Sequence, residues 1–268
     1  MFVENGYNTV RCSNCGLIYL NPRPNETALV AGYEKEYFDT RRDNEAVQLK
    51  NAQRQFDILK GHFQSMKTRP HPIRLLEVGS ALGTFLKVSS DNGLEVTGID
   101  VSEHACDFAR ERYDVNAICG ILEDRMLPEA SFDIVAFSDV LSHVRSPRLF
   151  FEEVSRILVP GGLVYARVGD KGGPWRWYRR GKWSAPEHLY HFTRDLLDQY
   201  LSQVGIEKIK TYPAFDSAFP SFRHWVSPRI RIVYMALAAG DLVARRVCRA
   251  VGLTEDYYLV ARKYNDNK

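Results

Sequence analysis

The sequence predicts an α/β fold built on a mostly parallel sheet. Between residues 73 and 168, short apolar runs of strand length alternate with segments of helical periodicity. The first run, residues 73–78, leads into a glycine-containing turn and a helix that opens near Thr84, and a later run ends at Asp100. Because parallel strands end at one edge of a sheet, the turn and Asp100 are expected to share a ligand-binding crevice.

The turn after the first strand has the features of a nucleoside site. Gly79 permits a sharp bend where a side chain would clash, and Gly83 permits the helix start to pack close to the strand. Backbone N–H groups then point into the crevice. The Asp100 carboxylate is placed to accept hydrogen bonds from both hydroxyls of a ribose.

Residues inside and before the turn discriminate between nucleosides. A dinucleotide fingerprint requires a glycine two positions after the first, where this chain has Ala81. Pyrophosphate, and with it a nicotinamide oxidoreductase, is therefore disfavoured. Glu77, two positions before Gly79, would repel phosphate as well, whereas it suits a cationic amino acid group.

Length and composition set the outer bounds. The 268 residues suffice for one large domain or one domain with appendages, and the net charge of +3 argues for neither nucleic acid nor an acidic partner. The start of the chain has no signal-peptide pattern, and the apolar run at 232–240 is too short to span a bilayer. Five cysteines without a disulfide-framework spacing fit a reducing compartment. We therefore expect a cytoplasmic protein.

The pattern Glu77-x-Gly79-x-x-x-Gly83 followed by Asp100 resembles the S-adenosylmethionine site of class I methyltransferases. A Phe-Asp-x-Val strand at 132–135 and an Arg-x-Leu-x-Pro-Gly-Gly turn at 156–162 resemble later motifs of that family, in the same order. The resemblance implies a Rossmann-like, seven-stranded, mostly parallel sheet with an antiparallel last strand, a helical N-terminal cap and a helical C-terminal insertion. It also implies S-adenosyl-L-methionine as cofactor and S-adenosyl-L-homocysteine as product.

The resemblance further implies which residues bind the cofactor. The family often has an acid directly after the position of Gly120, where this chain has Ile121. Contact with the adenine is therefore assigned to Leu122 and Glu123. The N-terminal helical cap resembles the lid that covers the cofactor in this family, which adds Tyr33 and Tyr37 to the set. Aromatic residues at helical spacing can equally well belong to the hydrophobic core. The full set is Glu77, Gly79, Ser80, Ala81, Gly83, Phe85, Asp100, Val101, Leu122, Glu123, Ser138, Tyr33 and Tyr37.

A Pro-x-His-x-x-x-Phe-Thr segment at 186–193 and a Cys-x-x-Cys-Gly segment at 12–16 resemble a bacterial subgroup similar to ubiquinone-biosynthesis O-methyltransferases. The sulfonium methyl is already an electrophile, so the protein must hold a nucleophile in line with the S–CH3 bond. For a hydroxyl acceptor a base helps, and neutral imidazole is suited to this role near pH 7. His188 is the leading candidate, followed by His143, Asp139 and His191, while a structural role is the alternative for any single histidine.

The acceptor is expected to be a small molecule or a glycan. The loop 169–193 contains three tryptophans, three arginines and two lysines, which could stack on a ring and hold an anion or could form an ordered loop with solvated charges. The fourth strand is followed by Ser-Asp-Val-Leu at 138–141 instead of Asn-Pro-Pro-Tyr, so nucleic-acid bases are not expected targets. Two alternatives stay open: a non-catalytic S-adenosylmethionine-binding subunit, and an N- or C-methyltransferase acting on a small metabolite.

Four parts are expected along the chain. Residues 1–66 form a knuckle and helical cap, 67–213 the core with its substrate loop, 214–254 a helical insertion, and 255–268 the final strand and tail. Cys12 and Cys15 supply half of a tetrahedral zinc ribbon, so zinc is not expected, nor is a catalytic metal. The basic helix at 228–251 allows peripheral membrane contact, packing over the substrate mouth, or a homodimer.

Overall fold

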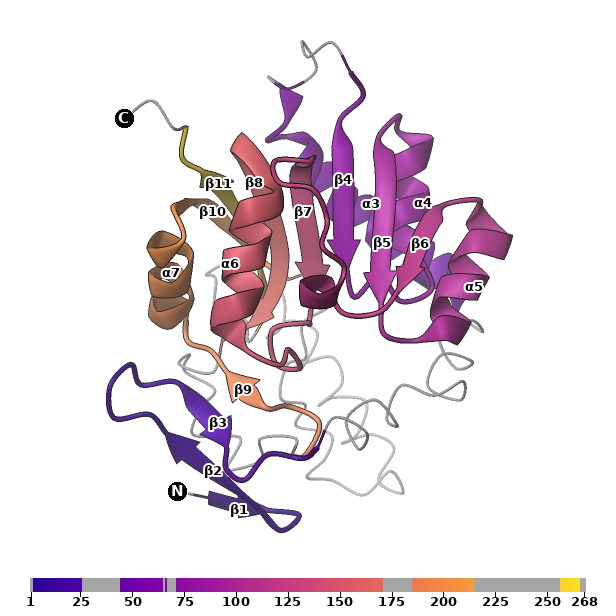
Figure 1. Cartoon of the computed structure of the whole chain (residues 1–268). Coiled ribbons are helices and arrows are strands. Elements are labelled where there is room, and N and C mark those ends of the chain that lie inside the picture. The colour runs from indigo at the N-terminus through magenta and orange to yellow at the C-terminus, as the bar shows by residue number, and fades with distance from the viewer. Residues whose placement is uncertain are drawn as a thin grey trace, which may run out of the picture.

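The computed structural model describes residues 2–25, 44–64, 66, 71–170, 185–214 and 256–265. Its centre is a seven-stranded sheet in the order β10-β11-β8-β7-β4-β5-β6 (Figure 1). Neighbouring strands are parallel from β8 to β6, whereas β11 is antiparallel to both β8 and β10. The expected mostly parallel sheet with an antiparallel last strand is confirmed. Its strands are β4 (Arg74–Val78), β5 (Glu95–Asp100), β6 (Asn116–Cys119), β7 (Phe132–Ser138), β8 (Leu158–Gly169), β10 (Ile206–Pro213) and β11 (Asp256–Lys263).

Helices cover both faces of this sheet, because its inner strands are apolar on both sides. Alternate residues of each strand therefore enter different cores: Leu76 and Val135 pack toward α6 and α7, while Leu75 and Ile134 pack toward the opposite face. Figure 1 shows α6 and α7 in front of the sheet and α3 and α4 behind it. The helices are α3 (Glu45–Lys60), α4 (Thr84–Asp91), α5 (Glu103–Tyr113), α6 (Pro147–Ile157), α7 (Arg194–Gln203) and the 3-10 turn η3 (Leu122–Asp124).

Side-chain caps fix where several helices begin. Ser102 Oγ accepts a hydrogen bond from the Ala105 N–H at the start of α5, and Thr193 Oγ1 accepts one from the Leu196 N–H at the start of α7. Pro147 occupies the first turn of α6, where no intrahelical N–H bond is lost. Local sequence thus defines the first turn of these three helices.

The Pro-Gly-Gly segment at 160–162 does not separate helix from strand. The sequence predicts a turn there and a strand from residue 163, whereas β8 begins at Leu158, directly after α6. The register of β8 against β7 shifts between Phe132 and Ile134, which accommodates the extra residues in a bulge. Gly161 has a φ of 73°, a conformation that suits glycine. The predicted start of this strand was therefore wrong.

A second, four-stranded antiparallel sheet was not predicted. It consists of β1 (Phe2–Glu4), β2 (Tyr7–Arg11), β3 (Ile18–Leu20) and β9 (Tyr190–His191), in that order. Figure 1 shows it beyond the carboxyl ends of the parallel strands, below their arrowheads. The N-terminal segment is thus paired with the segment that contains the Pro-x-His motif.

Several expectations concern residues outside the described ranges, namely the helix at 228–251 and most of the aromatic, basic loop. In the described part of the chain, no helix has the length and apolar character needed to cross a bilayer. Cys106 is fully buried and packs in the core, where burial raises the pKa of its thiol to about 12.

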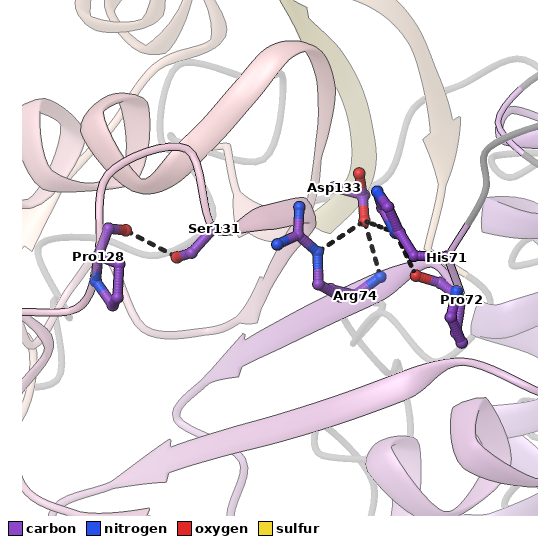
Figure 2. Close-up of polar contacts among 6 residues, drawn as sticks. All are labelled: His71, Pro72, Arg74, Pro128, Ser131 and Asp133. Carbon is purple, nitrogen blue, oxygen red and sulfur yellow. Dashed lines mark hydrogen bonds and ion pairs between the residues drawn. The ribbon is translucent and has the colours of Figure 1, made fainter.

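A buried acid joins the starts of β4 and β7 (Figure 2). Asp133 is fully buried, and its Oδ2 accepts hydrogen bonds from the backbone N–H of Arg74 at 2.9 Å and from Arg74 Nε at 3.3 Å. Figure 2 also shows His71 turned toward this carboxylate, with its Nδ1 3.9 Å from Oδ2. The acid of the Phe-Asp-x-Val strand therefore has a structural role far from the carboxyl edge.

Replacing this acid is expected to destabilise the fold. Asp133→Ala leaves the Arg74 N–H and guanidinium without their buried acceptor and should lower the free energy of unfolding by about 2–4 kcal/mol. Asp91→Ala, which removes an exposed i,i+4 ion pair with Lys87, should cost less than about 0.5 kcal/mol. Urea unfolding followed by circular dichroism compares the two, and equal losses would contradict the assignment.

Candidate active site

The turn after β4 is bound to the end of β5. The N–H groups of Gly79 and Ser80 donate to the Ile99 carbonyl at 2.7 and 3.1 Å, and the Gly83 N–H donates to the Ser80 carbonyl at 2.9 Å. Ala81, between them, has a φ of 46°. A turn pinned in this way keeps a fixed shape before any ligand binds.

Two positions in the turn require glycine. Gly79 has a φ of 70°, and a Cβ there would lie 2.5 Å from Val140 Cγ2. Gly83 has a φ of 77°, and a Cβ there would lie 2.8 Å from the Cβ of Ala109. The close neighbour of Gly83 is therefore helix α5, which corrects the expectation that this glycine lets the helix pack against its own strand.

Asp100 faces the turn in a fixed orientation. The residue is 8% exposed, and its two oxygens each accept a backbone hydrogen bond, Oδ2 from the Ala81 N–H at 2.8 Å and Oδ1 from the Ser102 N–H at 3.0 Å. A carboxylate oxygen has more than one lone pair, so these backbone bonds orient Asp100 without excluding hydrogen bonds from a bound diol.

Glu77 is a buried acid with an uncompensated oxygen. It is 6% exposed, and its Oε2 has no hydrogen-bond partner in the described part of the chain. Burial, and secondarily the nearby Asp100 carboxylate, raise the pKa of Glu77 well above its usual value. Ser80 Oγ is also buried, and it too has no hydrogen-bond partner within the described ranges. A ligand that carries positive charge and hydrogen-bond donors would satisfy these atoms, so the turn fits an amino acid nucleoside such as S-adenosylmethionine.

The other predicted cofactor residues are distributed around this turn. Phe85 is buried and stacks on Tyr165 with ring centroids 5.9 Å apart, and Leu122 is 1% exposed within the core on the α6 side. Val101 and Ser138 are half-buried at or after the carboxyl ends of β5 and β7. Tyr33 and Tyr37 lie outside the described residues. The cofactor roles of these residues stay predictions.

Glu123 lies in η3, which packs against α6. Its Oε1 is buried without a hydrogen-bond partner in the described ranges. Burial raises the pKa of Glu123, and the nearby Arg145 acts in the opposite direction. Glu123 Oε1 is thus a second buried acceptor, and it lies shortly after β6, where the adenine was predicted to bind.

Three predicted histidines lie together. The rings of His143 and His188 are edge-to-face with centroids 5.0 Å apart, and the rings of His188 and His191 are 6.2 Å apart. His143 and Val140 both lie in the segment that follows β7. Val140 contacts Gly79 of the cofactor turn, so this segment brings His143 close to that turn. Residues distant in sequence therefore meet beside the predicted cofactor site.

The environment of His143 favours neutral imidazole. Burial lowers the pKa of His143, and a hydrogen bond to the backbone of Glu187 opposes this effect less strongly. A ring nitrogen that donates to this carbonyl leaves the other nitrogen as an acceptor. His143 can therefore act as a proton acceptor near neutral pH.

Asp139 has different surroundings from the histidines. Its carboxylate forms an ion pair with Arg167, whose other nitrogen, Nη2, lies 3.0 Å from Asp256 Oδ2. An oxygen held by a guanidinium is less available to accept a proton from a substrate. Sequence analysis missed Arg167, because its partners lie on β11 and after β7 and only the sheet order brings them together.

The Cys-x-x-Cys segment forms the tight turn between β2 and β3. The Gly16 N–H donates to the Cys12 carbonyl at 3.0 Å, and the Cys12 N–H donates to the Leu17 carbonyl at 2.8 Å. Hydrogen bonding to the Cys15 backbone lowers the pKa of the Cys12 thiol. Within the described ranges, no group of three or more His, Cys, Asp or Glu residues could hold a metal ion.

Comparisons with known proteins agree with the nucleoside turn. Residues 76–166 match the family model described as methyltransferase domain. The chain is 30% identical over 141 residues to the biotin biosynthesis bifunctional protein BioHC of Cellvibrio japonicus, covering 50% of this chain and 28% of that protein. It is 30% identical over 115 residues to the ubiquinone biosynthesis O-methyltransferase of Maricaulis maris, covering 40% of this chain and 45% of that protein.

The fold is also found among solved structures. An S-adenosylmethionine-dependent methyltransferase from Mesorhizobium loti superposes with a TM-score of 0.52 at 19% identity, covering 72% of this chain and 91% of that one. This likeness concerns the fold alone. The chain spans less than half the length of the curated relatives named above.

The buried Glu77 is expected to cost stability when no ligand is bound. Its raised pKa means that the folded chain holds this proton more tightly than the unfolded chain, so stability falls as the pH rises above the usual carboxyl value of about 4.5. Glu77→Gln should therefore raise the melting temperature of the ligand-free protein by about 2–4 °C at pH 7.5 and by little at pH 4.5. Calorimetric scans across this range test it, with Asp91→Asn as an exposed control. A variant less stable than the parent at pH 7.5 would contradict the interpretation.

Proposed function

Because residues 76–166 form a class I methyltransferase domain whose cofactor is S-adenosyl-L-methionine, we propose that the chain transfers the cofactor's methyl group to a hydroxyl oxygen of a small-molecule or glycan acceptor. The observation that carries the proposal is the buried Glu77 at the glycine turn, whose Oε2 has no hydrogen-bond partner among the residues that the structure describes. A buried acid without a cation is costly. A cationic ligand offsets that cost, whereas a pyrophosphate would increase it.

The cofactor half of the site follows from the turn. Asp100, oriented by two backbone N–H groups, would accept hydrogen bonds from the ribose hydroxyls. Glu77 would offset the positive charge of the methionine moiety. When bound, the cofactor supplies an electrophilic methyl group on a sulfonium. The protein's own task is then to orient an acceptor and to take its proton.

The histidine pair supplies the acceptor half. His188 is proposed to accept the proton of the attacking hydroxyl, with the neutral His143 ring packed edge-on against it. Support comes from the 5.0 Å separation of the rings and from the contact between Val140 and Gly79, which puts this segment next to the cofactor turn. Similarity to the ubiquinone biosynthesis O-methyltransferase of Maricaulis maris supports oxygen as the methylated atom.

Loss of the ribose acceptor is expected to weaken cofactor binding. Asp100→Ala removes charge-assisted hydrogen bonds and should lower the affinity for S-adenosyl-L-methionine at least about 10-fold in titration calorimetry. Asp107→Ala removes an exposed acid on the neighbouring helix and should leave the affinity unchanged. Thermal unfolding establishes that both variants are folded. Parent protein that fails to bind the cofactor, or an Asp100 variant that binds it equally well, would contradict the proposal.

The rate of methyl transfer is expected to fall at low pH, where the histidine pair becomes protonated. Because an imidazole must be neutral to take a proton, the rate should rise as the pH increases through the range in which the histidine pair loses its protons. S-adenosyl-L-homocysteine release with a panel of hydroxyl acceptors, measured from pH 5 to 9, gives this profile. His188→Gln should slow release at least about 100-fold.

Two outcomes would count against this mechanism. An unchanged rate of methyl transfer in His188→Gln would exclude His188 as the general base. Cofactor binding without product release for any hydroxyl, amine or carbon acceptor would favour a non-catalytic S-adenosylmethionine-binding subunit, and release with amine or carbon acceptors alone would identify a different methylated atom.

A further inference from the structure

The segment that contains His188 and His191 is bound on one side to the chain that follows β7. The carbonyl of Ser142 accepts hydrogen bonds from the N–H groups of Leu189 at 2.7 Å and Tyr190 at 3.3 Å. Since His143 is the next residue after Ser142, these bonds set the spacing between the two histidine-bearing segments.

The other side of the same segment is bound to the N-terminal sheet. The Leu20 N–H donates to the Leu189 carbonyl at 3.0 Å. In the antiparallel ladder between β3 and β9, Ile18 is opposite His191 and Tyr19 is opposite Tyr190. Leu189 and His191 are almost completely buried. The N-terminal sheet therefore presses this segment against the chain that follows β7.

A side-chain clamp closes the arrangement. The Tyr190 hydroxyl donates to the Arg145 carbonyl at 3.0 Å, and Arg23 Nη1 donates to the same carbonyl at 2.6 Å and to the Tyr190 hydroxyl at 3.3 Å. The Arg145 guanidinium in turn binds both carboxylate oxygens of Asp124. One carbonyl thus receives a donor from β9 and another from the residues just after β3.

We propose that Tyr190 is a positioning residue for the histidine pair and that, through Tyr190 and Arg23, the N-terminal sheet is part of the acceptor half of the active site. The inference rests on the proposed function, because it gives the clamp the task of holding His188 over its acceptor. The Tyr190 hydroxyl acts through the backbone of its own segment and not on the substrate. Displacements of about 1 Å in such a segment can cost about 100-fold in rate.

The clamp also controls how much water reaches His143. The Glu187 carbonyl and the His188 ring, both on the clamped segment, lie against the His143 ring. If the segment loosens, His143 becomes hydrated and loses the desolvation that is the largest effect on its pKa. Its titration midpoint should then rise toward the usual histidine value. Titration of this ring therefore reports the clamp without any knowledge of the acceptor.

The test uses the full chain labelled with 15N-histidine, in which the ring signals of His143 and His188 are assigned from His143→Gln and His188→Gln. Tyr190→Phe removes only the hydroxyl, and it is expected to shift both ring signals and to raise the His143 midpoint by at least about 0.5 pH unit. Affinity for S-adenosyl-L-methionine, measured by calorimetry, should change by less than about 2-fold. Tyr264→Phe, the same change at a half-exposed position, should alter none of these.

A second variant keeps the test decisive if Tyr190→Phe fails to fold. Arg23→Gln changes an exposed side chain and removes the other donor to the Arg145 carbonyl, so it should shift the ring signals in the same direction. Ring signals and midpoints that match the parent in both variants would overturn the inference. Failure of the parent to bind the cofactor would instead overturn the proposed function, while the histidine signals would still decide whether the clamp positions the pair.

Discussion

The carbonyl of Ile99 is the acceptor on which the cofactor site depends. Parallel pairing of β4 with β5 brings the ends of the two strands to the same level, and this carbonyl then accepts from the N–H groups of Gly79 and Ser80. The same pairing delivers Asp100 to the Ala81 N–H. The turn and the acid are thus fixed relative to each other by backbone hydrogen bonds, before any ligand contributes binding energy.

The acceptor half of the site is built differently. It combines three segments that lie far apart in the chain: the residues after β7, the residues around β9, and β3 with Arg23. The contact between Gly79 and Val140 connects this half to the cofactor turn. A glycine required for the turn is therefore also the point at which the two halves meet.

Charge distribution distinguishes the two halves as well. Glu77 and Asp100 place two buried acids at the cofactor turn, and this combination favours a cationic nucleoside. On the acceptor side, burial lowers the pKa of His143, and the single positive charge of Arg167 is shared between Asp139 and Asp256 near the end of β8. A neutral imidazole beside a cationic cofactor avoids the repulsion that an imidazolium would add.

The sequence by itself determined the parts of this protein that rest on local chemistry. The order of strands and helices and the glycine turn after the first core strand depend on residues within a few positions of each other, so periodicity and spacing sufficed to predict them. Asp100 could be assigned to the same site because parallel strands end at one edge of the sheet. Only the tertiary structure decided the β8 bulge, the packing of Gly83 against Ala109, the pairing of β3 with β9, and the ion pairs of Arg167. These features arise between segments that no local pattern relates, because strand order and the free energy of packing act over the whole chain.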